Sequence, residues 1–162
     1  MGQLTTRLAT MDDYDAICRL LAQADRYHAD ILPEVFRVFP GPARPRDVVA
    51  EYVEAEDKAY FLAETNGEVV GCLNIARQTA SAYPMYRPRE FAMIMNVVVD
   101  EAHRRKGIGT ALLEEAKRWA RDRHLSVIQL GVWVANGPAV AFYAKHGFRV
   151  LTQKMELQLD SE

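Results

Sequence analysis

The sequence predicts a single mixed α/β domain, residues 1–162, built around a central sheet. Three observations support this fold class. Stretches with the two-residue period of a strand alternate with stretches of helical periodicity. The nearly unbroken apolar run at 91–99 is typical of a central strand that is covered on both faces. No linker, repeat or low-complexity stretch divides the 162 residues, a length at which one domain is the default.

The first half is expected to contain a strand, two helices and a hairpin. The first helix begins at Thr10, because Asp12 and Asp13 in its first turn complement the positive end of a helix. Asn66-Gly67 between two strand-like runs is a strong signal for a tight hairpin. The expected elements are a strand at 4–9, a helix from Thr10, a helix at 46–56, and strands at 59–64 and 69–77.

Two irregular segments, 33–45 and 78–89, are rich in proline and aromatic residues. The first contains four prolines and Gly41, which break regular structure. A loop this apolar usually packs against another part of the protein or against a ligand. It is either a lid over a ligand site or a packed loop, and the sequence leaves both readings open.

A long amphipathic helix dominates the second half. Asn136 can cap the helix that follows it, and Gly147 lies just past the end of that helix. The apolar face of the long helix consists of Ile108, Leu112, Ala116, Trp119 and Ala120. The expected elements are a strand at 91–99, this helix, a strand at 126–134, a helix after Asn136, and strands at 148–151 and 155–159.

Composition and charge argue against several classes of partner. The chain has 20 Lys and Arg against 22 Asp and Glu, a net charge of −2 that argues against a nucleic-acid binder. No apolar run approaches the roughly 18 residues that cross a bilayer, so we expect a cytoplasmic protein without a membrane partner. Cys18, Cys72 and the four histidines lack ligand spacing, and no metal site is expected.

The segment from Val97 to Thr110 carries the clearest chemical signal. A buried strand ends, a basic turn follows, and Gly107 and Gly109 open the long helix. Glycines allow close approach of the main chain to a ligand, and the first helical turn offers N–H donors at its positive end. This arrangement suits a phosphate or pyrophosphate. Taken alone, the segment could also be a basic helix entry that binds nothing.

A second segment makes the signal specific. The pattern Arg104-x-x-Gly107-x-Gly109 resembles the acyl-CoA pyrophosphate motif of the GCN5-related N-acetyltransferase (GNAT) superfamily. Asn136, followed by Ala141-Phe142-Tyr143-x-x-x-Gly147-Phe148, resembles the next conserved element of that superfamily. The resemblance covers essentially the whole chain and is strongest over 91–150. Either motif alone would be weak, whereas both in this order are highly specific.

The resemblance implies a central, mostly antiparallel sheet flanked by helices, with middle strands 91–99 and 126–132 that splay apart. The pantetheine arm of acetyl-CoA would lie in the gap and bond to the backbone of Val97 and Val99. The pyrophosphate would lie on N–H groups from Arg105 to Thr110, and no metal is implied. The residues that the resemblance assigns to the co-substrate are Val97, Val98, Val99, Arg104, Arg105, Lys106, Gly107, Ile108, Gly109, Thr110 and Asn136.

The implied reaction is direct transfer of an acetyl group from the thioester to a primary amine in a ternary complex. A backbone N–H near Val98 is the expected donor to the oxyanion. Tyr143 matches the family tyrosine that often protonates the leaving thiolate, and the alternative for it is a packed residue. The acceptor is a small-molecule amine or a protein amine, and a homodimer is common among such proteins. A non-catalytic acyl-CoA-binding or regulatory module of the same fold is the alternative function.

The chain departs from the family pattern at the general base. Many relatives carry a glutamate on the strand that corresponds to 91–99, whereas Met93 and Met95 stand at the matching positions here. Proton removal would then use water or a residue from elsewhere. Glu90, Glu34 and His28 are the candidates, and Tyr86 could help to place a water.

Overall fold

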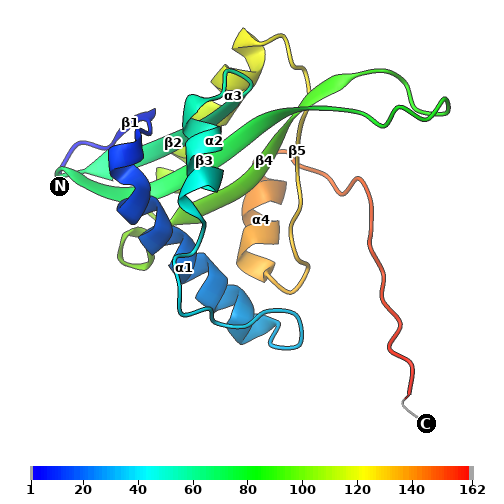
Figure 1. Cartoon of the computed structure of the whole chain (residues 1–162), viewed down its shortest axis with the longest axis horizontal. Coiled ribbons are helices and arrows are strands. Elements are labelled where there is room, and N and C mark those ends of the chain that lie inside the picture. The colour runs from blue at the N-terminus through cyan, green and yellow to red at the C-terminus, as the bar shows by residue number, and fades with distance from the viewer. Residues whose placement is uncertain (1, 161–162) are drawn as a thin grey trace. The chain divides into compact units, whose positions relative to one another are not determined.

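A computed structural model describes residues 2–160 of the chain (Figure 1), which divide between Gly131 and Val132 into two compact units. The two units are described separately below. The expectation of a single domain over residues 1–162 stays a prediction.

The first unit contains a five-stranded sheet in which sequence order and spatial order agree, β1-β2-β3-β4-β5. The first three pairings are antiparallel and only β4 and β5 run parallel, which confirms the mostly antiparallel sheet. Asn66 and Gly67, with φ of 52° and 76°, form the expected tight turn between β2 and β3. The strands are β1 (Thr5–Leu8), β2 (Lys58–Thr65), β3 (Glu68–Thr79), β4 (Glu90–Val99) and β5 (Ile128–Leu130).

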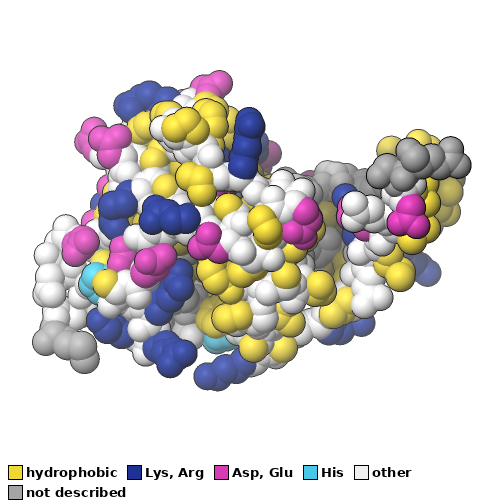
Figure 2. Space-filling view, turned by 90° about the horizontal axis from the view of Figure 1, so that it is seen from below, with side chains coloured by type: hydrophobic (Ala, Val, Ile, Leu, Met, Phe, Trp, Pro, Cys, Tyr) yellow, Lys and Arg dark blue, Asp and Glu magenta, His cyan; other side chains and the backbone are white. Residues whose placement is uncertain are grey.

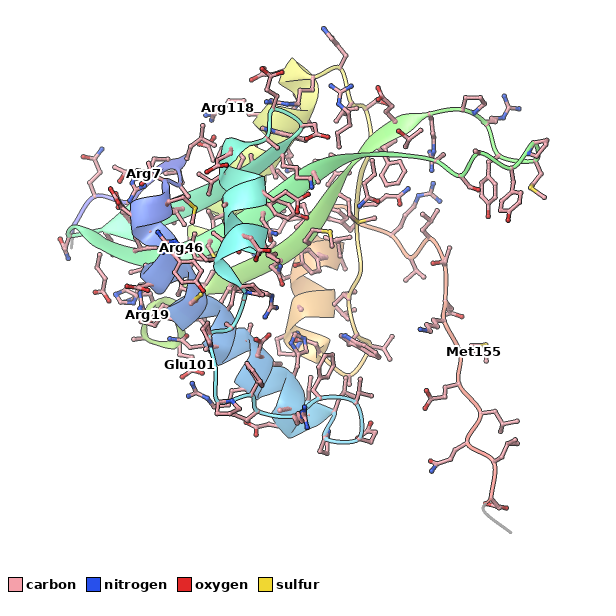
Figure 3. The ribbon with its side chains drawn as sticks, viewed as in Figure 1. Arg7, Arg19, Arg46, Glu101, Arg118 and Met155 are labelled. Carbon is pink, nitrogen blue, oxygen red and sulfur yellow. The ribbon has the colours of Figure 1, made fainter. Side chains whose placement is uncertain are left out.

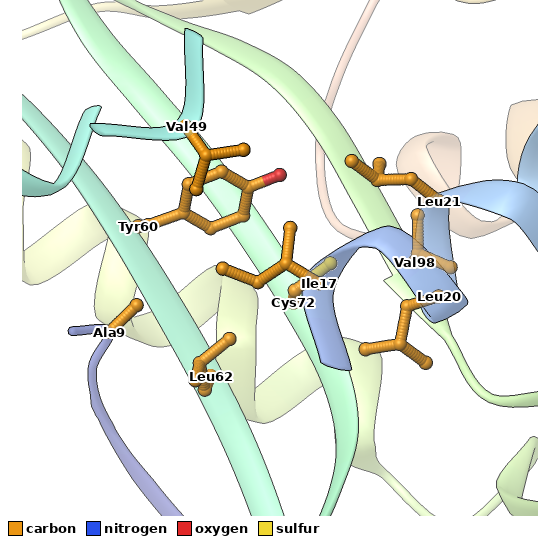
Figure 4. Packing of buried hydrophobic residues seen from close by; sticks show 9 residues of the cluster. All are labelled: Ala9, Ile17, Leu20, Leu21, Val49, Tyr60, Leu62, Cys72 and Val98. Atoms are coloured by element: carbon orange, nitrogen blue, oxygen red, sulfur yellow. The ribbon is translucent and has the colours of Figure 1, made fainter. Parts of the chain in front are cut away.

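Helices α1 (Tyr14–Ile31) and α2 (Arg46–Glu54) cover one face of this sheet, and α3 (Ile108–Asp122) covers the other (Figure 1). Thr10 and Asp13 form a capping box at the short 3₁₀ turn η1 (Met11–Asp13), so the chain enters α1 where the sequence predicts. Figure 4 shows the core on the α1 side. Its buried members are Ala9, Ile17, Leu20, Leu21, Val49, Tyr60, Leu62, Cys72 and Val98.

The first turn of α3 lies very close to the sheet at Gly71 of β3. A Cβ atom added to Gly71 would lie 2.8 Å from Cγ2 of Ile108 and 3.2 Å from the carbonyl oxygen of Val98. Ile108 and Leu112 are buried against this surface. The absence of a side chain at Gly71 therefore fixes how deeply the start of α3 sits on β3 and β4.

The second unit contains α4 (Gly137–Lys145), whose two ends are set as the sequence predicts. Asn136 Oδ1 accepts a hydrogen bond from the Ala139 amide at 3.2 Å, and Pro138 occupies the first turn. Gly147 follows the helix with φ of 89°, a left-handed conformation that glycine adopts without strain.

The strands expected at the C-terminal end of the chain are wrong in part. β5 spans only three residues of the expected 126–134, and residues 148–151 and 155–159 form no strand. Residues 155–159 do alternate between apolar and polar, but a strand also needs a hydrogen-bonded neighbour, and the structure pairs none with them. Met155, Leu157 and Leu159 are consequently about four-fifths exposed or more.

Charged side chains are mixed on the face shown in Figure 2, where Lys and Arg lie among Asp and Glu. In residues 2–160, no helix is long and apolar enough to cross a membrane. Over the same range, no group of three or more His, Cys, Asp or Glu side chains is placed to hold a metal ion.

Candidate functional site

Strands β4 and β5 separate after a short parallel pairing. The register pairs Ala92 with Ile128 and Ile94 with Leu130, and it extends no further. From Met95 to Val99, the edge of β4 that faces β5 therefore has no strand partner in the described chain. An unpaired edge exposes N–H and C=O groups that can bind an extended ligand.

A β-bulge at Met95 determines which backbone groups face this open edge. Asn96 pairs with Asn74 and Ile94 with Ile75, so Met95 has no partner on β3. The Asp100 amide donates to the Val70 carbonyl of β3 at 2.8 Å, so the amides of Val98 and Asn96 face β3 as well. The backbone groups of Val97 and Val99 therefore face the open edge. Bulges of this kind are frequent beside active sites.

The basic turn after β4 has two residues in the left-handed region. Arg105 has φ of 62° and Gly107 has φ of 79°. Consecutive amides in such a turn form a concave surface that favours an anion. A Cβ atom added to Gly107 would meet no atom within 4 Å, so there is open space above this residue. The exposed side chains of Arg104 and Lys106 add positive charge here.

The start of α3 continues this surface. Gly107 is its N-cap, and the first hydrogen bond to it runs from the Ala111 amide at 3.0 Å. The first turn of any helix presents N–H groups that no preceding carbonyl reaches, at the positive end of the helix dipole. The structure thus brings the predicted residues Val97 to Thr110 into one continuous strip of the first unit. This strip fits a ligand that has an extended amide-bearing arm and a pyrophosphate.

Tyr143 and Asn136, the other predicted site residues, lie in the second unit. The Tyr143 ring lies 5.3 Å from that of Phe142 and 5.6 Å from that of Phe148. Burial raises the pKa of Tyr143 to about 12, so its hydroxyl keeps its proton at neutral pH. The Asn136 side-chain carbonyl caps α4 as described above.

The candidate bases differ in their surroundings. Glu90 forms an ion pair with Arg77 at 2.9 Å, as expected for a solvated charge at the end of a strand. The His28 ring lies 5.3 Å from that of Phe36, and Glu34 is exposed in the turn after α1. Met95 is 49% exposed at the bulge itself.

Sequence reasoning missed three features that shape this site. The bulge at Met95 has no sequence signal, because it depends on the pairing register. Gly71 does carry one, because a glycine inside a strand often marks a close approach. The sequence shows Asp100 only as the residue that follows a strand. Its contacts with α1 depend on the tertiary fold.

The chain also contains a cavity of about 380 Å³ where β1 ends beside β2. Its walls come from β2, the end of α2 and the second half of α3, and include Tyr52, Tyr60 and Trp119. None of its lining residues belongs to the strip at 95–110. It is therefore separate from the candidate site.

Comparison with known proteins gives consistent matches. The profile of the Acetyltransferase (GNAT) family matches residues 24–148. Streptothricin acetyltransferase A from Bacillus subtilis (strain 168) is 36% identical over 102 residues, which are 63% of this chain and 54% of that protein. The match thus spans about half the length of that relative. An N-alpha-acetyltransferase from Sulfolobus acidocaldarius is 28% identical over 159 residues, 96% of this chain and 86% of that protein.

Solved structures match over nearly the whole chain. A crystal structure of a mutant of the BH1408 protein from Bacillus halodurans has a TM-score of 0.91 and 26% identity, and covers 96% of this chain and 99% of that one. The aminoglycoside N-acetyltransferase AAC(6')-Iy in complex with CoA has a TM-score of 0.74 and 12% identity, covering 99% of this chain and 97% of that one. At this identity, the second likeness shows the fold alone.

Proposed function

Because this chain belongs to the acetyltransferase (GNAT) family, we propose that it transfers acetyl from acetyl-CoA to a primary amine by direct attack in a ternary complex. The observation that carries the proposal is the open edge of β4 from Met95 to Val99, followed at once by the left-handed turn and the start of α3. Together they offer one binding strip for both parts of the co-substrate.

In this proposal, the backbone of Val97 and Val99 holds the pantetheine arm as an added strand. The amides from Arg105 to Thr110 hold the pyrophosphate, and Arg104 and Lys106 supply charge beside it. The main chain does most of this work, so the glycines matter more than the basic side chains. Asn136 is assigned to the pantetheine by the family resemblance.

The chemistry needs a neutral amine and a donor to the oxyanion. An alkylamine has a pKa of about 10.4 in water, so the acceptor must lose a proton before it attacks. The alternation of β4 turns the Val98 amide toward β3, and this favours the amide of Val97 at the open edge as the oxyanion donor. Attack forms the C–N bond, and collapse of the tetrahedral intermediate breaks the C–S bond.

Tyr143 is proposed to donate to the leaving sulfur. A thiol has a pKa of about 8.5, well below the value of about 12 for this phenol, so complete proton transfer to the thiolate would be uphill. A hydrogen bond that shortens as negative charge develops on sulfur avoids this cost. We therefore assign Tyr143 the role of hydrogen-bond donor in the transition state. The thiolate takes its final proton from water or from the nitrogen of the tetrahedral intermediate, which gains a positive charge when the neutral amine attacks.

The acceptor class remains broad within the proposal. The relatives include a streptothricin acetyltransferase and an N-alpha-acetyltransferase, which indicates either a small amine or a protein amine. The stretch 47–68 has seven acidic residues against Lys58, and such a field would attract a cationic acceptor. The proposal needs no metal and places the protein in the cytoplasm. A homodimer stays a prediction, which the molar mass from light scattering would test.

A thiol-release assay with acetyl-CoA and a panel of amines tests the proposal. The panel contains a streptothricin, an aminoglycoside, free amino acids and peptides with a free N-terminus. We expect release of one CoA thiol per acetylated amine with at least one class. Binding of acetyl-CoA without thiol release from any class would instead support the non-catalytic acyl-CoA-binding module.

Substitution of Gly107 by Glu tests where the co-substrate binds. Gly107→Glu places bulk and negative charge in the open space of the turn, so acetyl-CoA binding should be lost in calorimetry. Gly67→Glu is a matched control, because Gly67 has nearly the same φ and the same open space but lies in the β2–β3 hairpin. Equal affinity in both variants would overturn the proposed site.

A further inference from the structure

The Asp100 side chain lies at the point where β4 ends and the basic turn begins, and it is only 7% exposed. Its Oδ1 atom accepts from the Ala102 amide at 3.0 Å and lies 3.2 Å from Nδ1 of His103. Its Oδ2 atom accepts from Arg19 Nη1 at 2.7 Å and from Gln23 Nε2 at 3.1 Å. A carboxylate has about four acceptor positions, so both oxygens are fully used.

Two of these partners come from α1, on the opposite side of the sheet from α3. The Arg19 guanidinium also donates to the Val69 carbonyl at 2.6 Å. Gln23 Oε1 accepts from the Glu101 amide at 3.0 Å, so this one side chain holds two successive residues. Figure 3 shows Arg19 and Glu101 close together where α1 passes the end of β4. We call Asp100, Arg19, Gln23 and His103 the Asp100 cluster.

We propose that the Asp100 cluster clamps the loop at residues 101–107 to α1 and thereby positions its amides for acyl-CoA. Asp100, Arg19 and Gln23 are then positioning residues, because they act on the co-substrate only through the loop. The inference rests on the proposed function, since it concerns the loop that would hold the pyrophosphate.

The loop needs such support because its conformation is costly. Arg105 adopts a left-handed conformation that is strained for a residue with a side chain. The side-chain bonds that Arg104 and Lys106 make to carbonyls at the ends of this turn are long, 3.4 Å each. The bonds from α1 are shorter, at 2.7–3.1 Å.

α1 is a rigid support for this purpose. Leu20 and Leu21, on the turn between Arg19 and Gln23, are completely buried in the core. The two polar side chains therefore project from a backbone that the core holds in place. A pair of amides aligned by a fixed support binds an anion better than amides that must first be ordered.

The charge state of Asp100 agrees with this role. Burial alone would raise the pKa of Asp100, but hydrogen bonds from His103, Gln23, the Ala102 amide and Arg19 together lower it to about 2. The carboxylate therefore stays ionised over the physiological range. Both oxygens remain acceptors, and the orientation of Gln23 is fixed because only its amide nitrogen can face them.

Replacement of Gln23 by Leu is the sharpest test, because it removes the bonds of Gln23 to Asp100 and to the Glu101 amide and keeps the approximate size of the side chain. Arg26→Leu is the matched control, since Arg26 lies exposed on the same helix. We expect Gln23→Leu to weaken acetyl-CoA binding about tenfold in calorimetry, as the loss of bonds to charged and backbone groups predicts. Asp100→Asn should weaken it further, and Arg26→Leu should leave it unchanged.

Two further measurements separate positioning from simple stabilisation. Hydrogen exchange of the 101–107 amides in the free protein should accelerate in Gln23→Leu while exchange in β2 and β3 stays slow. KM for acetyl-CoA should rise while kcat at saturation changes little. Wild-type affinity in both Gln23→Leu and Asp100→Asn would overturn the clamp. Failure of the wild-type protein to bind acetyl-CoA would instead overturn the proposed function. If Asp100→Asn does not fold, Gln23→Leu still decides.

Discussion

Arg105 and Gly107 occupy the same left-handed region of backbone space, yet they differ in what that conformation costs. Glycine adopts it freely, whereas a residue with a Cβ loses about 1–2 kcal/mol. A protein retains such a residue when the surrounding structure compensates the cost. The bonds of the Asp100 cluster supply this compensation directly before the turn.

The role of Tyr143 can be tested at the level of one oxygen atom. Tyr143→Phe removes the hydroxyl and keeps the ring, whose neighbours Phe142 and Phe148 remain packed against it. If the hydroxyl donates to the developing thiolate, kcat should fall about 10²–10³-fold while the Kd of acetyl-CoA stays the same. Stopped-flow thiol release and calorimetry measure the two quantities.

Phe142→Leu serves as the control, because it disturbs the same aromatic group without removing a polar atom. Phe142→Leu should lower the melting temperature, whereas its kcat should stay close to that of the wild type. An equal loss of kcat in both variants would mean that Tyr143 acts by packing, which is the alternative reading of this residue.

Single residues of the site differ in how far the sequence predicts them. Gly107 and Arg104 belong to a motif with fixed spacing, so they can be read directly from the chain. The role of Met95 depends on a bulge, and Asp100 depends on an α1 that passes 77 positions away in sequence. Neither relation is visible in a window of neighbouring residues.

At the scale of elements, β4 is divided into two parts with different partners. Its first part has strands on both sides, and its second part has β3 on one side only. The apolar run at 91–99 predicts the strand but not this division, because both parts are apolar. The sequence overestimates β5 for the same reason: its length depends on where the neighbouring strand separates from it. Strand is also overestimated at 148–151 and 155–159, because an alternating pattern forms no strand without a hydrogen-bonded partner.

The depth of α3 on the sheet leads to a prediction about Gly71. In Gly71→Ala, the new Cβ would lie 2.8 Å from Ile108 Cγ2, 3.1 Å from Leu112 Cδ1 and 3.2 Å from the Val98 carbonyl. The side chains can adjust but the carbonyl belongs to β4, so α3 must move outward. We expect a loss of about 1–3 kcal/mol in the free energy of unfolding, measured by urea denaturation.

The same displacement would move the first turn of α3 relative to the edge of β4, so acetyl-CoA binding should weaken as well. Gly131→Ala is the control for the unfolding measurement, because a Cβ there meets no atom within 4 Å. If Gly71→Ala unfolds at the same urea concentration as the wild type, the close approach at Gly71 does not contribute to stability. The proposed link between Gly71 and the depth of α3 is then wrong.

For the molecule as a whole, the near-zero net charge hides a local asymmetry. Residues 101–124 contain seven Lys and Arg against four Asp and Glu, whereas 47–68 contain seven Asp and Glu against Lys58. The fold class and the location of the basic segment follow from the sequence, since they depend on periodicity and a spaced motif. Which charges face a ligand depends on the tertiary fold and cannot be read from the net charge. Figure 2 shows Lys and Arg side chains mixed with Asp and Glu on one face.

This asymmetry predicts how acetyl-CoA binding responds to salt. Charges on an exposed loop are screened over about 10 Å at 0.1 M ionic strength, whereas hydrogen bonds from backbone amides persist. The Kd should therefore rise about three- to tenfold between about 0.05 and 0.5 M salt without loss of binding. Lys106→Gln should flatten this dependence. Lys117→Gln, which removes the partner of Glu114 farther along α3, should keep it. A Kd independent of salt would contradict a role for the basic turn, and complete loss of binding at high salt would contradict the dominant role of the main chain.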